Sequence, residues 1–272
     1  MNTFPAPKVA ANWTKLARQY ARFSAPLRPD PEDVALFSKA VHGHGARVLL
    51  LGVTPALAGL GDDLLAVEAM PDVIAALWPG DSADRHAVAG DWRALPCHDQ
   101  SRSAIVGDGV LSAVDADPGD LLQEFLRVLE PGGVIAIRCF CAPDRPEPID
   151  LIIEDATAGR VPNMNVLKWR LSMHLSGNDP LFRVPVLSVL ELFNRLFPDR
   201  TRFLEQTGWQ RSDFDFIDLY RGSDSVLRFL SEDRLRAVFM DTGFRLIVLK
   251  PQGYPLADRS PLFVLHKSIE QE

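Results

Sequence analysis

The sequence predicts an α/β protein whose sheet is doubly wound and mostly parallel. Short apolar runs recur from residue 48 onward, and segments of helical periodicity separate them. Short runs of this kind are typical of strands that are buried on both faces of a sheet. Parallel neighbours need a long crossover connection, so this alternation favours parallel strands with helices on both faces.

The composition limits the class of protein. The chain of 272 residues is 47% hydrophobic and 24% charged, which is typical of a globular protein with a sizeable core. A net charge of −7 argues against a general nucleic-acid binder, which needs a basic surface. The amino terminus lacks the apolar core of a signal peptide, and no apolar run is long enough to span a bilayer. We therefore expect a cytoplasmic protein without a nucleic-acid or membrane partner.

The cysteines and histidines do not indicate a metal centre or a disulfide framework. Cys97, Cys139 and Cys141 are few and odd in number, which fits a reducing compartment. The pairs His42–His44 and Cys139–Cys141 lack further ligands at metal-site spacing, so we expect no metal. The oligomeric state stays open, with a homodimer as one alternative.

The amino-terminal segment, residues 1–45, is expected to be helical. Apolar residues at helical spacing predict a helix over residues 8–23. A second helix begins at Asp30 and Pro31, because aspartate caps a helix and proline suits its first position. This helix leads directly into the first strand.

The next stretch predicts half of a nucleotide-binding unit. A strand at 48–51 is followed by Thr54 and Pro55, residue types that suit a helix cap and the first helical position. A second strand at 64–67 then ends at Glu68. Free N–H groups at a helix start can hold polar ligand atoms, and a carboxylate can accept hydrogen bonds from both ribose hydroxyls. Glu68 is either this ribose ligand or an ordinary surface acid.

The remaining core elements follow the same alternation. They are a helix from Pro71, strands at 86–89 and 103–106, a helix at 121–129, a strand at 134–140, a helix at 231–241 and strands at 244–250 and 262–267. Residues 46–143 and 226–272 thus form the core of one domain. Residues 144–225 are an insertion with helices expected at 163–177 and 185–196.

Several motifs of this core resemble those of the class I S-adenosylmethionine-dependent methyltransferases. Residues 48–56, VLLLGVTPA, resemble the family's first motif, VLDLGCGTG, with one matching glycine. Residues 128–133, VLEPGG, resemble its R-x-L-K-P-G-G turn. The resemblance covers residues 30–141 and 226–267. It implies a seven-stranded sheet that ends in an antiparallel hairpin.

The resemblance also implies a cofactor, S-adenosylmethionine, with S-adenosylhomocysteine as product. In this family the amino-terminal segment often folds over the cofactor. An acid and a flat side chain lie beside the adenine, where this chain has Asp91 and Trp92. The implied cofactor-binding positions are Tyr20, Arg28, Gly52, Val53, Thr54, Pro55, Glu68, Ala69, Met70, Asp91, Trp92, Gly107, Asp108 and Gly109.

Besides Glu68, three of these positions keep two interpretations. Asp91 either lies beside the adenine or caps a turn, since aspartate favours turns. Asp108 either faces the sulfonium and substrate or shapes a sharp turn between two glycines. Arg28 either pairs with the methionyl carboxylate or is a surface arginine.

The insertion is expected to be a lid that supplies the substrate pocket, because ligands of open α/β sheets bind beyond the carboxyl ends of the strands. The alternative is a solvated helical elaboration that never contacts substrate. Candidate substrate residues are Trp13, Asn163, Trp169 and His174. No residue is assigned a catalytic role, because an in-line methyl transfer needs alignment of the reactants rather than a dedicated acid or base.

The function predicted from the sequence is therefore methyl transfer from S-adenosylmethionine to a small molecule. One alternative is a regulatory protein that binds the cofactor but has lost catalysis, because the second glycine of the first motif is missing. A second is a nicotinamide-dependent oxidoreductase. The absence of G-x-G-x-x-G argues against it, since those glycines allow close approach of the pyrophosphate.

Overall fold

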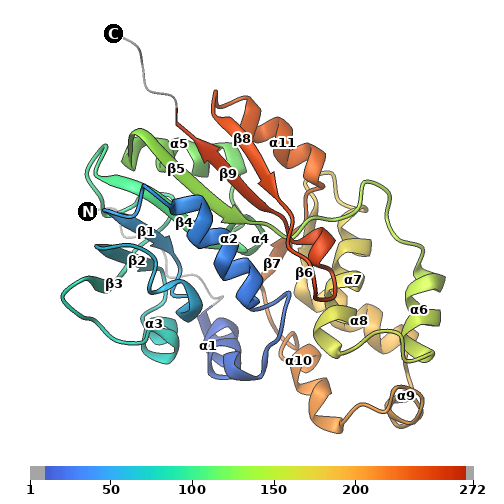
Figure 1. The fold of residues 1–272 in the computed structure, drawn as a ribbon. Coiled ribbons are helices and arrows are strands. Elements are labelled where there is room, and N and C mark those ends of the chain that lie inside the picture. Colours follow the sequence, from blue (N-terminus) through green and yellow to red (C-terminus); the bar gives the residue numbers. More distant parts are fainter. Residues whose placement is uncertain (1–9, 268–272) are drawn as a thin grey trace.

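The computed structural model describes residues 10–267, with side chains described from residue 14 onward. A seven-stranded sheet forms the core, in the order β3-β2-β1-β4-β5-β9-β8 (Figure 1). The strands are β1 (Val48–Leu51), β2 (Leu64–Glu68), β3 (Arg85–Ala89), β4 (Arg102–Asp108), β5 (Leu129–Arg138), β8 (Arg245–Leu249) and β9 (Leu262–His266). The first five strands are parallel, and β9 runs antiparallel to both β5 and β8. The predicted sheet and its terminal hairpin are confirmed.

Helices cover both faces of this sheet. They are α1 (Ala10–Arg18), α2 (Pro31–Val41), α3 (Pro71–Leu77), α4 (Val110–Ala113), α5 (Pro118–Val128) and α11 (Glu232–Met240). Strand β1 shows why both faces must be covered, since its side chains alternate between two apolar clusters. Leu49 and Leu51 pack in the cluster of α5 and α11, whereas Val48 and Leu50 pack in the cluster of α2 and α3.

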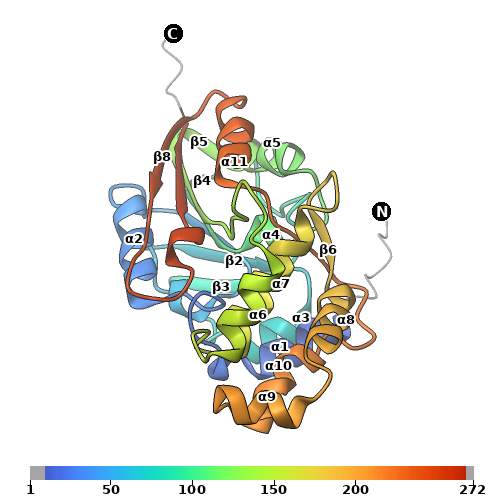
Figure 2. The same ribbon diagram turned by 90° about the vertical axis from the view of Figure 1, so that its right-hand side faces the viewer.

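The insertion between β5 and α11 forms a helical layer beside the sheet (Figures 1 and 2). Its elements are α6 (Ile149–Thr157), α7 (Met164–Ser176), β6 (Arg183–Pro185), α8 (Val186–Leu196), α9 (Arg200–Thr207), the 3₁₀ turn η3 (Arg211–Phe214), α10 (Asp215–Asp218) and β7 (Val226–Arg228). Strands β6 and β7 pair antiparallel at its base. The insertion has an apolar core of its own, which includes Phe140 just after β5 and also Phe23 from the amino-terminal segment.

Two expected helices are shorter in the structure. The helix expected over residues 8–23 ends at Arg18 and is followed by the 3₁₀ turn η1 (Tyr20–Arg22), while residues 8 and 9 lie outside the described range. The helix expected from Pro55 is only the 3₁₀ turn η2 (Pro55–Leu57), and Thr54 makes no capping bond. Only residues 52–63 join β1 to β2, so the link crosses from one strand to the next without room for a full helix.

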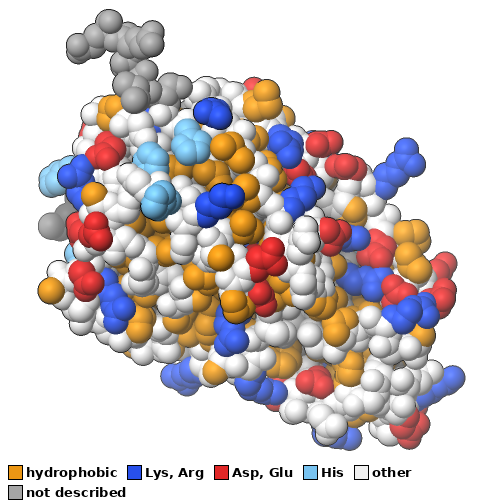
Figure 3. Space-filling view, in the orientation of Figure 1, with side chains coloured by type: hydrophobic (Ala, Val, Ile, Leu, Met, Phe, Trp, Pro, Cys, Tyr) orange, Lys and Arg blue, Asp and Glu red, His pale blue; other side chains and the backbone are white. Residues whose placement is uncertain are grey.

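Strand β5 begins earlier than expected, at Leu129, because this residue pairs with Arg102 ahead of a register shift in β4. Every helix among the described residues is too short or too polar to cross a membrane. On the face drawn in Figure 3, basic and acidic side chains are interspersed over the surface.

Gly61 makes the short β1–β2 link possible. Its φ is +100°, and a Cβ there would lie 2.4 Å from Cγ2 of Val48 and 2.6 Å from the carbonyl oxygen of Gly45. Gly61→Ala should therefore destabilise the protein by more than about 3 kcal/mol, through backbone strain and overpacking together. Gly43 is a matched control, because its φ is +82° but a Cβ there meets nothing within 4 Å.

Urea unfolding of both variants would measure this difference. Gly43→Ala should lose only the backbone contribution of about 1–2 kcal/mol. Equal losses in the two variants would show that the link yields around the added methyl group.

Candidate functional site

The carboxyl ends of β1, β2 and β4 meet where the strand order reverses. In open α/β sheets, ligands bind at this point. Gly52 follows β1, Glu68 ends β2 and Asp108 ends β4. The topology thus brings three of the predicted positions to the same edge of the sheet.

Gly52, Glu68 and Trp92 form the first part of the candidate site. Gly52 has a φ of +89°, and a Cβ there would lie 3.7 Å from the indole of Trp92 and 3.9 Å from Oε2 of Glu68. Oε1 of Glu68 accepts a hydrogen bond from the Met70 N–H at 3.1 Å, and the indole Nε1 of Trp92 donates to the Val67 carbonyl at 2.7 Å. A carboxylate oxygen and a flat ring therefore meet beside a residue without a side chain.

Burial raises the pKa of Glu68, although hydrogen bonds from the backbone N–H groups of Met70 and Ala69 oppose this shift. The carboxylate is thus held out of water by the loop that follows β2. A hydrogen-bonding ligand that replaces the lost water would stabilise its charged form.

Asp91 contacts its own loop. Its carboxylate accepts hydrogen bonds from the backbone N–H and guanidinium of Arg93, which lower the pKa of Asp91. Asp91 also forms an isolated bridge with Ala94. These contacts stabilise the turn that presents Trp92.

The residues after β1 lack the expected helix N-terminus. Val53 is buried, Thr54 is half-buried and Pro55 opens the single turn η2. One turn of 3₁₀ helix presents fewer aligned N–H groups than an α-helix does.

The two glycines around Asp108 allow close packing. A Cβ on Gly107 would lie 2.5 Å from Val110, and one on Gly109 would lie 2.8 Å from the ring of Phe140. Gly109 also has a positive φ of +68°. Both glycines let α4 and the end of β5 approach the end of β4.

Asp108 pairs with a buried arginine that the sequence analysis missed. Nε of Arg138 donates to Asp108 at 2.6 Å, and the same fully buried guanidinium reaches Asp33 at 2.9 Å and the Pro26 carbonyl at 2.8 Å. Burial opposes the charged form of Arg138, but the Asp108 and Asp33 carboxylates together raise its pKa. The signal in the sequence is an arginine that ends the apolar run of β5.

Tyr20 and Arg28 bring the amino-terminal segment to this edge. The hydroxyl of Tyr20 is buried without a hydrogen-bond partner in the described residues. Burial, and then the charge of Asp108, raise the pKa of Tyr20, while Arg28 and Arg138 oppose the shift. Tyr20 also lines a cleft of about 540 Å³ between α1, η2 and α3.

The candidate substrate residues do not come together. Asn163 caps α7 by accepting a hydrogen bond from the Val166 N–H at 3.0 Å, and His174 contacts the Glu147 carbonyl at 2.9 Å near the other end of that helix. Trp169 is buried against Phe140, which follows β5. The side chain of Trp13 lies outside the described residues.

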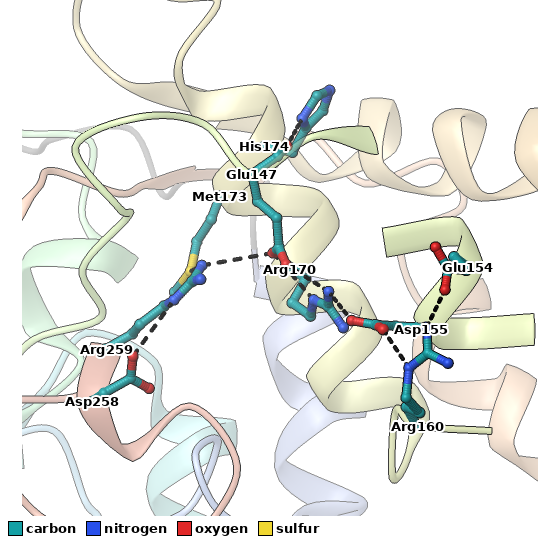
Figure 4. Close-up of polar contacts among 9 residues, drawn as sticks. All are labelled: Glu147, Glu154, Asp155, Arg160, Arg170, Met173, His174, Asp258 and Arg259. Carbon is teal, nitrogen blue, oxygen red and sulfur yellow. Dashed lines mark hydrogen bonds and ion pairs between the residues drawn. The ribbon is translucent and has the colours of Figure 1, made fainter. Parts of the chain in front are cut away.

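A network of ion pairs fastens the insertion to the core (Figure 4). Arg170 of α7 contacts Glu147 at 2.5 Å and Asp155 of α6 at 2.7 Å. Glu147 also lies 3.8 Å from Arg259, which belongs to the 3₁₀ turn η4 (Ala257–Arg259) before β9. The insertion is thus bound to the terminal hairpin as well as to its own core.

Arg138→Met should destabilise the protein strongly, because it leaves the Asp33 and Asp108 carboxylates buried without their cation. Breaking a buried pair in this way costs about 3–5 kcal/mol. Tyr254 is the control: its hydroxyl donates to Asp33 at 2.8 Å and accepts a longer hydrogen bond from Arg138 at 3.3 Å, so Tyr254→Phe removes these two contacts and leaves the ion pairs. The free energy of unfolding of Tyr254→Phe should be lower than that of the unmodified protein by about 1 kcal/mol.

Chemical denaturation followed by circular dichroism would compare the two variants. A loss for Arg138→Met as small as that for Tyr254→Phe would show that water or a local rearrangement compensates the two carboxylates.

No group of three or more histidine, cysteine, aspartate or glutamate side chains among the described residues is placed to hold a metal ion. Residues 52–137 match the family described as a methyltransferase domain. Among curated proteins, no sequence matches this chain.

Two solved structures share its fold over nearly the whole chain. One, described as a zinc-dependent alcohol dehydrogenase of Rhodobacter sphaeroides, has 13% identity and a TM-score of 0.58, with 98% of this chain and 100% of that chain covered. The other, a methyltransferase of Haloferax volcanii in complex with the Trm112 methyltransferase activator, has 13% identity and a TM-score of 0.52, with 97% and 100% covered. At this identity both similarities concern the fold alone.

The matched segment runs from Gly52 to the end of β5 and includes Glu68, Trp92 and Asp108. Its sheet continues into the antiparallel hairpin that the motifs implied. Residues 52–137 are thus similar to a methyltransferase domain, and the sheet that contains them ends in the antiparallel hairpin that the resemblance to class I S-adenosylmethionine-dependent methyltransferases implied.

Proposed function

We propose that this protein binds S-adenosylmethionine and transfers its methyl group to a small molecule. The observation that supports this most directly is the convergence of Gly52, Glu68 and Trp92 at the reversal of strand order. The carboxylate would hold the ribose hydroxyls, and the indole would lie against the adenine. Ala69 and Met70 would border the adenosine from the loop after β2.

The residues present fit this cofactor at its adenosine end. Glu68 uses Oε1 for the Met70 N–H, whereas Oε2 lies on the side of Gly52, 3.9 Å from where a Cβ of that residue would be. A half-buried carboxylate suits a diol ligand, since charge-assisted hydrogen bonds are the stronger ones. A side chain at position 52 would occupy the space between this oxygen and the indole.

At the methionyl end, side chains of the amino-terminal segment would bind the cofactor in place of the N–H groups of the missing helix N-terminus. Arg28 forms no ion pair with any other described residue, and it lies close enough to Tyr20 for its charge to lower the pKa of that residue. Its guanidinium would pair with the methionyl carboxylate, and the Tyr20 hydroxyl would add a hydrogen bond. Val53, Thr54 and Pro55 would line the same end through their backbone.

The bound cofactor supplies an electrophilic methyl group on a sulfonium. The chain has to align the acceptor with that methyl group and exclude water. Alignment alone can lower the activation free energy by several kcal/mol, roughly 7–11 kcal/mol at the upper end. Asp108 is held by Arg138 beside this position, so its negative charge is fixed at the edge where the sulfonium would lie.

The purified protein should bind S-adenosylhomocysteine in preference to NAD. The reason is that Glu68 can hold a ribose, whereas Gly52-Val53-Thr54 lacks the glycines that admit a pyrophosphate. Isothermal titration calorimetry with both ligands would measure the preference. Tight binding of NAD without binding of S-adenosylhomocysteine would overturn the proposed function.

Glu68→Ala should weaken S-adenosylhomocysteine binding about tenfold or more, because a charge-assisted contact contributes on the order of 1.5–3 kcal/mol. Glu205→Ala is the control, because Glu205 is an exposed glutamate on α9, in the insertion. Calorimetry on both variants, after circular dichroism has shown that they are folded, would separate the effects. Unchanged affinity in Glu68→Ala would mean that Glu68 is an ordinary acid after a strand.

A further inference from the structure

The amino-terminal segment and helix α7 of the insertion carry buried polar atoms without hydrogen-bond partners. Nε1 of Trp169, Oδ1 of Asn165 and the hydroxyl of Tyr20 are buried without a hydrogen-bond partner in the described residues. Trp169 is 5% exposed and Asn165 is 3% exposed. The other buried unpartnered atoms among the described residues belong to Arg102 and Arg228, whose guanidinium groups have further contacts. Buried polar groups normally have partners, so these unpartnered atoms require an explanation.

Helix α7 buries a stripe of side chains that carry polar groups. Asn165, Lys168, Trp169 and Ser172 follow the spacing i, i+3, i+4 and i+7, which places them on one side of the helix. All four are buried. Arg170 and His174, elsewhere on the same helix, contact Glu147 instead (Figure 4). The helix therefore has two separate polar faces, and only one is used by the ion-pair network.

Lys168 is the only cation of the stripe, and it is 1% exposed. Its Nζ donates to the Phe216 carbonyl at 3.3 Å and lies 4.9 Å from the centre of the Tyr220 ring. Within residues 10–267 it forms no ion pair, and burial alone lowers its pKa to about 7. Buried charges are normally paired, so an anionic ligand would supply the partner that the chain lacks.

The stripe is adjacent to the candidate cofactor site. The Trp169 ring lies edge to face with Phe140 at 5.3 Å and with Phe229 at 5.2 Å. Phe140 in turn lies against Gly109, directly after Asp108. One aromatic ring therefore separates Trp169 from the end of β4.

We propose that the stripe recognises the methyl acceptor, and that the acceptor is a planar aromatic carboxylate with a hydroxyl or amino group. This inference rests on the proposed function. Lys168 pairs with the carboxylate, Nε1 of Trp169 donates to a ligand oxygen, and Oδ1 of Asn165 accepts a hydrogen bond from the hydroxyl or amino group. Phe140 and Phe229 border the aromatic ring.

The test compares 4-hydroxybenzoate with its neutral counterpart 4-hydroxybenzamide, by calorimetry on protein saturated with S-adenosylhomocysteine. The carboxylate should bind about tenfold or more tightly, which is the usual effect of a charge-assisted contact. Lys168→Met should remove this preference. Lys39→Met, a change of an exposed lysine on α2, should leave it unchanged.

The pH dependence of this preference is a second readout, and it can be measured on the unmodified protein. As the pH falls from 8 to 6, Lys168 gains its proton while the ligand carboxylate stays ionised, so the preference for the carboxylate should grow. The only ionisable ring against Lys168 in the described residues is Tyr220, whose raised pKa keeps it neutral in this range. In nitrogen-15 NMR spectra, the carboxylate should also shift the indole N–H signal of Trp169. Trp169→Phe assigns that signal, and Trp209→Phe serves as its control.

Equal affinities for the two probes, a preference that is independent of pH, or no binding of either probe would overturn this inference. These outcomes are separate from failure of the proposed function. That failure is the absence of S-adenosylhomocysteine binding, and the probes can then still be compared on the free protein.

Discussion

The buried cluster around Arg138 joins distant segments of the chain at the carboxyl ends of β4 and β5. Its guanidinium joins the ends of β4 and β5 to the first turn of α2 and to the backbone at Pro26. Tyr254 adds a contact from the loop between β8 and β9. Desolvating an arginine and two carboxylates costs several kcal/mol per ion, so such a cluster persists only when nearly every donor is paired. Segments far apart in the sequence are thereby held around one point.

This cluster explains how the chain can have a short first crossover and still present a site. The link from β1 to β2 has only a single 3₁₀ turn, so it lacks the aligned N–H groups of a helix N-terminus. The cluster holds the amino-terminal segment through the Pro26 carbonyl, and this segment carries Tyr20 and Arg28. Under the proposed function, the side chains of Tyr20 and Arg28 would take the place of those backbone N–H groups.

The insertion is attached to the rest of the chain by apolar packing and by ion pairs. Its apolar core takes in Phe23 and Phe140, and its ion pairs reach the terminal hairpin through Arg259. Segments with many buried contacts open less readily than segments with few. The polar stripe of α7 is therefore held next to Phe140, directly after β5, by the same packing that stabilises the insertion. A ligand that reached it would meet preorganised groups, and preorganisation lowers the cost of binding.

Much of the fold follows from local patterns in the sequence. The cap formed by Asp30 and the proline start of α2 occur as expected, with Asp33 completing a capping box, because capping depends on residues a few positions apart. The buried run of β1 and the termini of α7 and α8 also follow from local periodicity and breaks. Topology then brings Gly52 and Glu68 to one edge, so this part of the site was predictable.

The sequence alone could not determine the features that depend on contacts between segments far apart in the chain. The residue types at positions 55–58 favour the start of a helix. The short link from β1 to β2 overrides that preference, and only a 3₁₀ turn forms. Arg138 pairs with Asp33 across more than a hundred residues, and nothing in its local sequence names that partner. The spacing of polar residues on α7 is visible in the sequence, yet only the packing of Phe140, Phe216 and Phe229 decides which face is buried. Local chemistry determined the elements, and long-range packing determined which of their polar groups lost contact with water.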